Sequence, residues 1–425
     1  MRKNALWYQF IRTCVQIWTN LFFKKMILEH TDRLPRKKPI VMVMNHQNSF
    51  LDAFIFVGFY WWKFQHFMTN AMVFRIPVVK HILRSLNLIP VFRMKDGVSE
   101  VGKNKEIFDE CTNYLKMNDV IIIFPEASHN LNRRLRPLSK GFTRIVFGTM
   151  NKFDWDLDLQ ILPISLNYSD HTKARNYVYG YLHEPIPALK FKEAYDENPN
   201  KAALHLKVEV EEKIKSKMIH IDSLDEYPVH HILMDDLEPN PFDLINPDLG
   251  NERTKKISEH IQETDINKAN ELLEGLDKLG LRLKYLINTP IRAWQKLALI
   301  PGILIYLNTY IPHYPIRHIT EKLLTDHAWD ASLKLLAAGI LFPFYYLIVF
   351  SILYFGFNLG IIAIVYLALS LLSVILYPSV KKIMTVLSQQ RAFRSLEKQN
   401  PDLYKNLVTE IEHFQSLRKE IIDSE

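Results

Sequence analysis

The residues of this sequence best suited to chemistry are polar groups that interrupt apolar runs. The run 40–44 is followed by Asn-His-Gln-Asn-Ser, which places His46 just after a strand-like segment, and Asp52 comes six residues later. A histidine can take up a proton near neutral pH while a carboxylate holds its other ring nitrogen. Six residues of ideal helix would leave the two side chains about 120° apart. We therefore expect His46 in a loop and Asp52 in the first turns of the helix that follows.

A second polar interruption follows the run 120–124. Glu126 comes directly after this run and a proline, a costly place for a carboxylate unless it binds something. In sheets built from alternating strands and helices, sites gather where strands end and helices begin. The two interruptions therefore predict one shared site. A hydrogen-bonded structural role for His46 and a helix cap for Glu126 are the alternatives.

The elements that must position these residues can be read from the pattern of apolar runs. Helical stretches alternate with short β-branched runs at 40–44, 87–93, 120–124, 159–167 and 176–182. Such alternation is typical of an α/β sheet with buried strands. The 48% hydrophobic content and 13 glycines exclude disordered and collagen-like classes.

Four blocks in a fixed order carry a family resemblance. They read NHQNSFLD, LIPVFR, FPEASHNLNRRLRPLSKG and LPISLNY. In this order they resemble the glycerolipid acyltransferases, over roughly residues 38–187. The resemblance implies a mixed sheet flanked by helices. It also implies acyl transfer from acyl-CoA or acyl-carrier protein to a hydroxyl of lysophosphatidic acid or glycerol 3-phosphate in phospholipid biosynthesis, with no metal and no bound cofactor.

The resemblance also assigns roles to individual residues. It makes His46 the general base and Asp52 its partner. The residues it implies for holding the glycerophosphate acceptor are Arg93 and Glu126, and Lys140 matches the family's basic residue after the third block. Arg133 and Arg134 belong to an added basic cluster, which could meet the acceptor phosphate, the pyrophosphate of coenzyme A or lipid headgroups, or form a solvated loop. The sequence departs from the family pattern at several positions, among them Ala127 and Asn87, each in place of a glycine, and two further departures concern the site. Five residues rather than the usual four separate His46 from Asp52, and His129 stands where the third block usually has arginine.

The C-terminal half contains long uncharged runs. Residues 335–354 and 359–377 are each long enough to span a bilayer core at about 1.5 Å per residue, and they predict a transmembrane helical hairpin. The run 297–311 is shorter and holds Pro301 and Gly302, so we expect it at the interface unless it crosses fully. Basic residues flank the hairpin and are absent from its turn, which predicts that the catalytic domain and the C-terminal tail both face the cytosol.

The net charge of +7 equals the excess of the first 40 residues, which hold nine Lys and Arg against two acidic residues. Apolar and aromatic residues recur there at helical spacing, which favours a helix lying on a membrane surface. Packing on the domain's own core is the alternative. We expect membrane lipid, not nucleic acid, as the partner. Two cysteines exclude a disulfide framework.

The sequence thus predicts an integral membrane enzyme with the following segments: an interface helix over 1–30, an acyltransferase domain over 31–190, a helical insertion over 191–290, a membrane region over 291–382 and a charged cytosolic tail over 383–425. Dihydroxyacetone phosphate or a lyso-aminolipid are alternative acceptors. Two other classes, a non-catalytic membrane scaffold and a zinc hydrolase, stay open. The scattered histidines share no metal-ligand spacing, which disfavours zinc.

Overall fold

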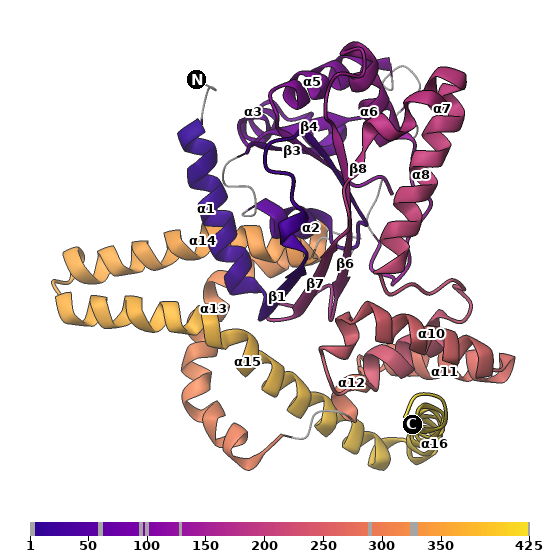
Figure 1. Ribbon diagram of the computed structural model, residues 1–425. Coiled ribbons are helices and arrows are strands. Elements are labelled where there is room, and N and C mark those ends of the chain that lie inside the picture. Colours follow the sequence, from indigo (N-terminus) through magenta and orange to yellow (C-terminus); the bar gives the residue numbers. More distant parts are fainter. Residues whose placement is uncertain are drawn as a thin grey trace. The chain divides into compact units, whose positions relative to one another are not determined.

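The computed structural model of the chain describes residues 5–57, 63–92, 97, 102–126, 130–287, 291–323 and 330–423. The chain divides into two compact units, Met1–Met218 and Ile219–Glu425. Figure 1 shows the first as a sheet covered by helices and the second as helices alone. The predicted acceptor residue Arg93 and the third-block residue His129 lie outside the described residues.

The first unit is built on one eight-stranded sheet in the order β1-β7-β6-β2-β5-β3-β4, with β8 paired to β6. Pairing is parallel except where β6 meets β7 and β8, so the predicted mixed sheet is confirmed. The strands are β1 (Lys25–Glu29), β2 (Ile40–Met44), β3 (Gln65–Asn70), β4 (Leu88–Val91), β5 (Val120–Ile123), β6 (Gln160–Tyr168), β7 (Tyr177–Leu182) and β8 (Ile186–Pro187).

Helices cover both faces of this sheet (Figure 1). On one face lie α1 (Ala5–Phe22) and α2 (Ser49–Val57). On the other lie α5 (Asn104–Lys116), α6 (Gly141–Lys152) and α8 (Pro199–Ser216), preceded by the short α7 (Lys192–Glu197). The central strand β2 is buried along its whole length because alternate residues enter the two layers. Its Val41 and Val43 join the core made with α5, α6 and α8.

Five strands lie within two residues of their predicted runs, whereas β1, β3 and β8 were not predicted. The segment 1–30 is helical only to Phe22, and Lys25–Glu29 forms the edge strand β1, paired in parallel with β7. The first unit also extends beyond residue 190. Helix α8 adds Ala202, Leu206, Val210 and Ile214 to the core of the sheet, so this unit ends at Met218.

The second unit is helical. Its elements are α9 (Tyr227–His230), a π-helix (His231–Asp236), α10 (Pro247–His260), α11 (Glu263–Lys278), α12 (Leu283–Leu286), α13 (Ala293–Leu323), α14 (Asp330–Ser351), a second π-helix (Ile352–Gly356), α15 (Gly360–Gln399) and α16 (Pro401–Ile421). Within the predicted charged tail 383–425, residues 383–399 and 401–421 are helical, and Leu396, Leu407 and Phe414 are buried in one cluster with residues of α10 and α11.

Buried charges fasten α16 to this cluster. Arg418 donates to a carboxylate oxygen of Glu238 at 2.8 Å and to the carbonyl oxygen of Leu233. Arg253 donates to the same Glu238 oxygen at 2.7 Å. Removing one partner from such a network would leave a buried charge uncompensated, which is strongly destabilising. Residues 219–287 and 383–423 therefore belong to one folded unit rather than to an insertion and a separate tail.

The predicted hairpin segments are helical. Helix α14 and the π-helix after it cover 335–354, and α15 begins at Gly360 and continues well past residue 377. Among the described residues, α15 is the one helix long and apolar enough to cross a membrane, and Leu341–Gly356 is a shorter apolar helix. Residues 297–311 lie within α13, where Asn308 donates to the hydroxyls of Ser370 and Ser373 on α15. Membrane insertion and its direction stay predictions.

Candidate active site

The structure brings His46 and Asp52 together at the end of strand β2. His46 lies in the four-residue loop between β2 and α2, and Asp52 lies in the first turn of α2, as expected from their spacing. The imidazole Nδ1 is 2.8 Å from Asp52 Oδ2. The Asp52 side chain is fully buried, while that of His46 is 16% exposed. This leaves Nε2, the nitrogen not bonded to Asp52, as the one suited to exchange a proton with a substrate.

Asp52 has two further hydrogen-bond donors. The Tyr168 hydroxyl donates to Oδ1 at 2.5 Å, and the backbone N–H of Asn48 donates to Oδ2 at 2.8 Å. Burial, together with the adjacent Asp52 carboxylate, raises the pKa of the Tyr168 phenol well above its ordinary value, which keeps it a donor. The carboxylate is therefore held at both oxygens, and its orientation toward His46 is fixed by groups from β6 and from the loop.

The loop that carries His46 is anchored to the sheet by Asn45. Its side-chain amide donates to the carbonyl oxygen of Leu166 at 3.0 Å, and its side-chain oxygen accepts from the N–H of Leu166 at 2.8 Å. The Asn45 side chain thus takes the place of a backbone partner for β6 where β2 ends. The next helix begins at Ser49, whose φ of 44° lies in the left-handed region that serine rarely adopts.

Glu126, in the segment that follows β5, also holds the loop that carries His46. One carboxylate oxygen accepts the backbone N–H of His46 at 2.7 Å, and the other accepts the backbone N–H and the Nε–H of Arg136 at 3.1 Å and 3.3 Å. Burial raises the pKa of Glu126, whereas these donors lower it in part. The Glu126 side chain is 1% exposed, and its hydrogen bonds position the backbone of His46 and the side chain of Arg136. A direct contact with an acceptor stays a prediction.

The other predicted acceptor residues lie in different environments. Arg133 is buried and donates to the carbonyl oxygen of Tyr168 at 3.0 Å, so it supports the strand that carries the tyrosine. Arg134 is half-buried, and Lys140 is exposed at the N-terminus of α6. Arg136 is linked to His46 through Glu126, which accepts hydrogen bonds from both residues.

Sequence reasoning missed Tyr168 and His171. The carbonyl oxygen of His171 accepts from the Asn48 side chain at 2.6 Å, and its ring lies 3.3 Å from the Gln47 side-chain oxygen. One signal for Tyr168 was present, since it ends the fourth block and directly follows a predicted strand. Nothing in the sequence signals His171, because only the folded sheet brings the end of β6 beside the loop after β2.

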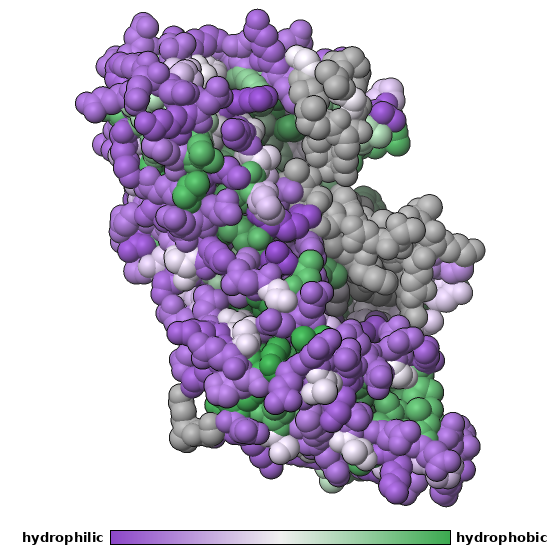
Figure 2. Space-filling model, turned by 90° about the vertical axis from the view of Figure 1, so that its right-hand side faces the viewer, coloured by the Kyte–Doolittle hydropathy of each residue, from purple (hydrophilic) through white to green (hydrophobic). Residues whose placement is uncertain are grey.

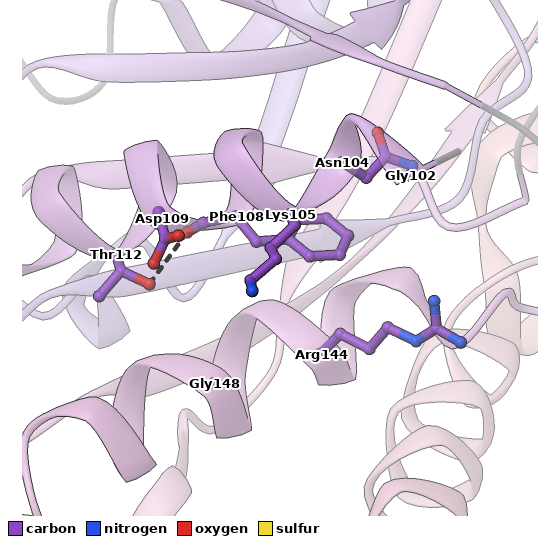
Figure 3. Close-up of a pocket in the computed structure, with 8 residues that line it drawn as sticks. All are labelled: Gly102, Asn104, Lys105, Phe108, Asp109, Thr112, Arg144 and Gly148. Carbon is purple, nitrogen blue, oxygen red and sulfur yellow. Dashed lines mark hydrogen bonds between the residues drawn. The ribbon is translucent and has the colours of Figure 1, made fainter. Parts of the chain in front are cut away.

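A separate pocket of about 330 Å³ lies between α5 and α6. Figure 3 shows Lys105, Phe108 and Asp109 on α5 facing Arg144 and Gly148 on α6. The single bond drawn there runs from the Thr112 hydroxyl to the carbonyl oxygen of Phe108, within α5. The pocket lies on the face of the sheet opposite α2 and shares no residue with the predicted site, so the His46 edge is the better candidate.

The arrangement around His46 is that of a general base with an oriented imidazole. Phe124 stacks on the His46 ring at 4.2 Å between centroids, which fixes the plane of the ring. Asp52 fixes its rotation and is placed to stabilise an imidazolium. Among the residues that the structure describes, no group of three or more His, Cys, Asp or Glu is arranged to hold a metal ion.

Several known proteins are similar to part of this chain. A family model described as Acyltransferase matches residues 25–167, which contain His46, Asp52 and Glu126. A 1-acyl-sn-glycerol-3-phosphate acyltransferase of Brassica napus chloroplasts, BAT2, is 26% identical over 200 residues. That match covers 44% of this chain and 54% of the relative, so the chain spans about half the length of that protein.

A 1-acyl-sn-glycerol-3-phosphate acyltransferase of Borreliella burgdorferi is 25% identical over 195 residues, covering 44% of this chain and 72% of the relative. Among solved structures, the 1-acyl-sn-glycerophosphate acyltransferase PlsC of Thermotoga maritima is similar at 20% identity and a TM-score of 0.37, over 50% of this chain and 80% of that one.

Proposed function

We propose that the chain is a glycerolipid acyltransferase that transfers a fatty acyl group from an acyl thioester to a hydroxyl of a glycerol phosphate lipid. The acyltransferase family model over residues 25–167 and the two relatives above support this. The observation that carries the proposal is the His46–Asp52 pair, held at 2.8 Å at the end of β2 inside the matched segment. Both relatives above are named for 1-acylglycerol 3-phosphate, so we propose this lysophosphatidic acid as the acceptor before glycerol 3-phosphate.

His46 acts as general base in the proposed reaction. Its Nε2 takes the proton of the acceptor hydroxyl while that oxygen attacks the thioester carbonyl carbon. The resulting imidazolium is stabilised by Asp52. The tetrahedral intermediate then collapses, its carbon–sulfur bond breaks, and the departing thiolate takes the proton from His46. The products are the acylated acceptor and the free thiol, and no metal or bound cofactor enters the reaction.

Arg136 is our first candidate for the acceptor phosphate among the described arginines. It shares Glu126 with the His46 backbone, and its side chain is 27% exposed, whereas Arg133 is buried against Tyr168. A guanidinium binds phosphate oxygens in pairs, which orients the neighbouring hydroxyl. Arg134, Lys140 and Arg93 stay predicted contacts of the same phosphate. The donor, acyl-CoA or acyl-carrier protein, is left to experiment.

We further propose that the enzyme works at a membrane, with its catalytic domain on the cytosolic side. The length and apolarity of α15 and the apolar helix Leu341–Gly356 support an anchor in the second unit. A lipid acceptor and a lipid product support the same location, because lysophosphatidic acid and phosphatidic acid both partition into the bilayer. The basic residues on both flanks of this anchor support the cytosolic orientation.

The test is an acyl-transfer assay of the purified full chain with labelled acyl-CoA and acyl-carrier protein, each offered to 1-acylglycerol 3-phosphate, glycerol 3-phosphate, dihydroxyacetone phosphate and a lyso-aminolipid. We expect labelled phosphatidic acid from the first acceptor, at a rate lowered by about 10²–10⁴ in His46→Ala. Arg136→Gln should raise the KM for the acceptor about tenfold, since a charge-assisted contact is lost. A folded protein that acylates none of the four acceptors would exclude the proposed function.

A further inference from the structure

The second unit has a pocket of about 570 Å³ at a junction of helices. Residues of α12, of the first turn of α13, of the part of α15 beyond its apolar half and of α16 line it. The pocket between α5 and α6 is smaller, at about 330 Å³. The described residues that line the larger pocket all follow Ile219, so it belongs to the second unit and is separate from the predicted catalytic site.

The charge of this pocket has one sign. Lys296, Arg391 and Arg394 line it, and none of the described residues that line it is acidic. Like charges around one pocket repel each other, and an anion that binds among them relieves the repulsion. Arginine offers a fork of donors and lysine a compact charge, and both bind phosphate oxygens well. The charges therefore favour a phosphate ligand.

Other basic residues of the second unit are neutralised by neighbouring carboxylates, as Lys278 is by Glu274 at 2.8 Å. By contrast, the side chains of Lys296, Arg391 and Arg394 form no ion pair and no hydrogen bond with any residue that the structure describes. All three are exposed. Their charges are thus available to a ligand in the pocket.

The same pocket has apolar walls. Leu286, Leu387 and Phe393 line it, and the ring of Phe393 lies 5.0 Å from that of Tyr404, between centroids. An inorganic phosphate ion would leave these surfaces in water. A phosphate that carries a glycerol and acyl chains would cover them, which is favourable because apolar area is buried. The walls therefore favour a phospholipid headgroup over a free phosphate.

Side chains beside the pocket favour the same ligand. In the first turns of α13, Trp294, Leu297 and Ile300 are 61%, 67% and 71% exposed. Exposed apolar residues with a tryptophan and a basic group are typical of the membrane interface. Lys296 lies among these residues in sequence, so a membrane that covers them would bring lipid headgroups to the pocket.

We propose that this pocket binds the phosphate of an anionic glycerophospholipid, with Lys296, Arg391 and Arg394 on the phosphate and the apolar walls against the glycerol and the first methylene groups. The choice of lipid rests on the proposed function. Its product, phosphatidic acid, ends in a phosphate monoester, which carries more negative charge than the phosphodiester of other phospholipids. The second unit then has a lipid site of its own, distinct from the site of acyl transfer.

The experiment titrates the purified full chain in neutral detergent with water-soluble dihexanoyl phosphatidic acid and measures affinity and stoichiometry by calorimetry. The catalytic site should also bind this product, so we expect two sites per chain. The double variant Arg391→Gln, Arg394→Gln should keep one site and lose affinity at the other by about 10² or more, because two charge-assisted contacts are removed. Circular dichroism verifies the fold, and Lys296→Gln tests the same site if the double variant fails to fold.

The matched control is the double variant Lys255→Gln, Lys278→Gln, which removes the same charge from exposed positions of α10 and α11. These helices lie on the face shown in Figure 2, whose lower part is mainly hydrophilic. The control should keep both sites. Equal loss of affinity in the two double variants would overturn the proposal, because binding would then depend on net charge alone.

The number of sites separates this proposal from the proposed function. A single site that the arginine variant loses would support the pocket and reject phosphatidic acid as a ligand of the catalytic site. A single site that the arginine variant keeps would overturn the pocket and leave the proposed function standing. Absence of binding would overturn both.

Soluble anions distinguish a lipid site from a site for free phosphate. Glycerol 3-phosphate and inorganic phosphate should bind the arginine-dependent site at least about tenfold more weakly than phosphatidic acid, since neither covers the apolar walls. Inorganic phosphate that binds as tightly as the lipid would overturn the assignment to a phospholipid. Dihexanoyl phosphatidylcholine, whose headgroup has no net charge, should bind this site at least as weakly as the soluble anions do.

Discussion

Two histidine–aspartate pairs lie at opposite ends of the same sheet. His46 follows the carboxyl end of β2 and pairs with Asp52 at 2.8 Å. His66 lies near the start of β3, where its Nε2 is 3.0 Å from the carboxylate of Asp119, the residue just before β5. Each ring also stacks on an aromatic side chain, His46 on Phe124 and His66 on Tyr114.

Access separates the two pairs. The His66 side chain is 4% exposed, and its second nitrogen, Nδ1, is buried without a hydrogen-bond partner among the described residues. The His46 side chain is 16% exposed, and its bonded carboxylate is oriented by a tyrosine and a backbone N–H. A histidine beside a carboxylate is therefore not a sufficient signal of catalysis. The two pairs differ in the end of the sheet at which they lie, in the exposure of the histidine side chain and in the groups that hold the carboxylate.

The largest expected effect is the difference in acyl-transfer rate between the His46 and His66 variants. His46→Ala should lower the rate of acyl transfer by about 10²–10⁴, because general-base catalysis is lost. His66→Ala should keep the rate within a few fold and lower the thermal unfolding midpoint, because the buried Asp119 loses its partner. Rates and thermal scans on both proteins measure this. His66→Gln retains a donor if the alanine variant fails to fold. Equal loss of rate in folded His46 and His66 variants would contradict the assignment of His46, and not His66, as the general base.

Substitutions of the two aspartates should differ in their effects in the same way as substitutions of the two histidines. Asp52→Asn should lower kcat by about 10² or more, since a neutral amide stabilises an imidazolium poorly. Asp119→Asn should affect the thermal midpoint and leave kcat nearly unchanged. Steady-state kinetics on matched preparations, with circular dichroism to verify folding, gives both quantities. A kcat loss confined to Asp119→Asn would place the active pair at the other end of the sheet.

A smaller effect concerns the tyrosines. Tyr168→Phe should lower kcat about tenfold with little change in KM, because Asp52 loses one of its donors and some of its orientation. The acid-side midpoint of the pH–rate profile should also rise, since a carboxylate with one donor fewer holds a protonated histidine more tightly. Tyr114→Phe removes a hydroxyl that donates to Glu110 and should leave the profile in place. An unmoved profile in Tyr168→Phe would make this tyrosine merely structural.

The smallest expected effect is on stability near the His66 pair. Lys63 is buried, donates to the side chain of Asn118 and has its pKa lowered to about 8 by burial. Unfolded lysine has a pKa of 10.5, so between these values the unfolded chain binds more protons and stability rises with pH. Lys63→Met should flatten this rise in the thermal midpoint, while acyl transfer at neutral pH is unchanged. Identical pH slopes in the two proteins would contradict the assignment.

Sequence reasoning reached most of the central sheet and the first members of the site. The runs that became β2, β5 and β6 are buried on both sides, so their composition alone predicts strands. By contrast, β1 and β3 carry polar residues that only their partners in the sheet explain. Asp52 was found because it lies in the turn next to His46, whereas Tyr168 lies 116 residues away from it and is brought near only by the pairing of β2 with β6.

The charged C-terminal segment 383–425 shows a second limit of prediction from the sequence. Its composition is that of a solvated tail, yet one face of α16 supplies Leu407, Ile411 and Phe414 to a core. Helical spacing in residues 401–421 held that information, but nothing near it in sequence showed what the face would meet. Arg418 contributes to the charged composition of this segment, yet it is buried and donates a hydrogen bond to Glu238.

Helix α15 is 40 residues long, which at about 1.5 Å per residue is about twice the thickness of a bilayer core. Its first half is apolar, and its last turns carry Leu396 into the cluster shared with α16. Pro378 interrupts the backbone hydrogen bonding of this helix near the end of its apolar half. With the apolar half in a bilayer, as proposed, a tilt or vertical shift of that half would be passed along the helix to Leu396, so that bilayer thickness would act on the packing of the C-terminal helices.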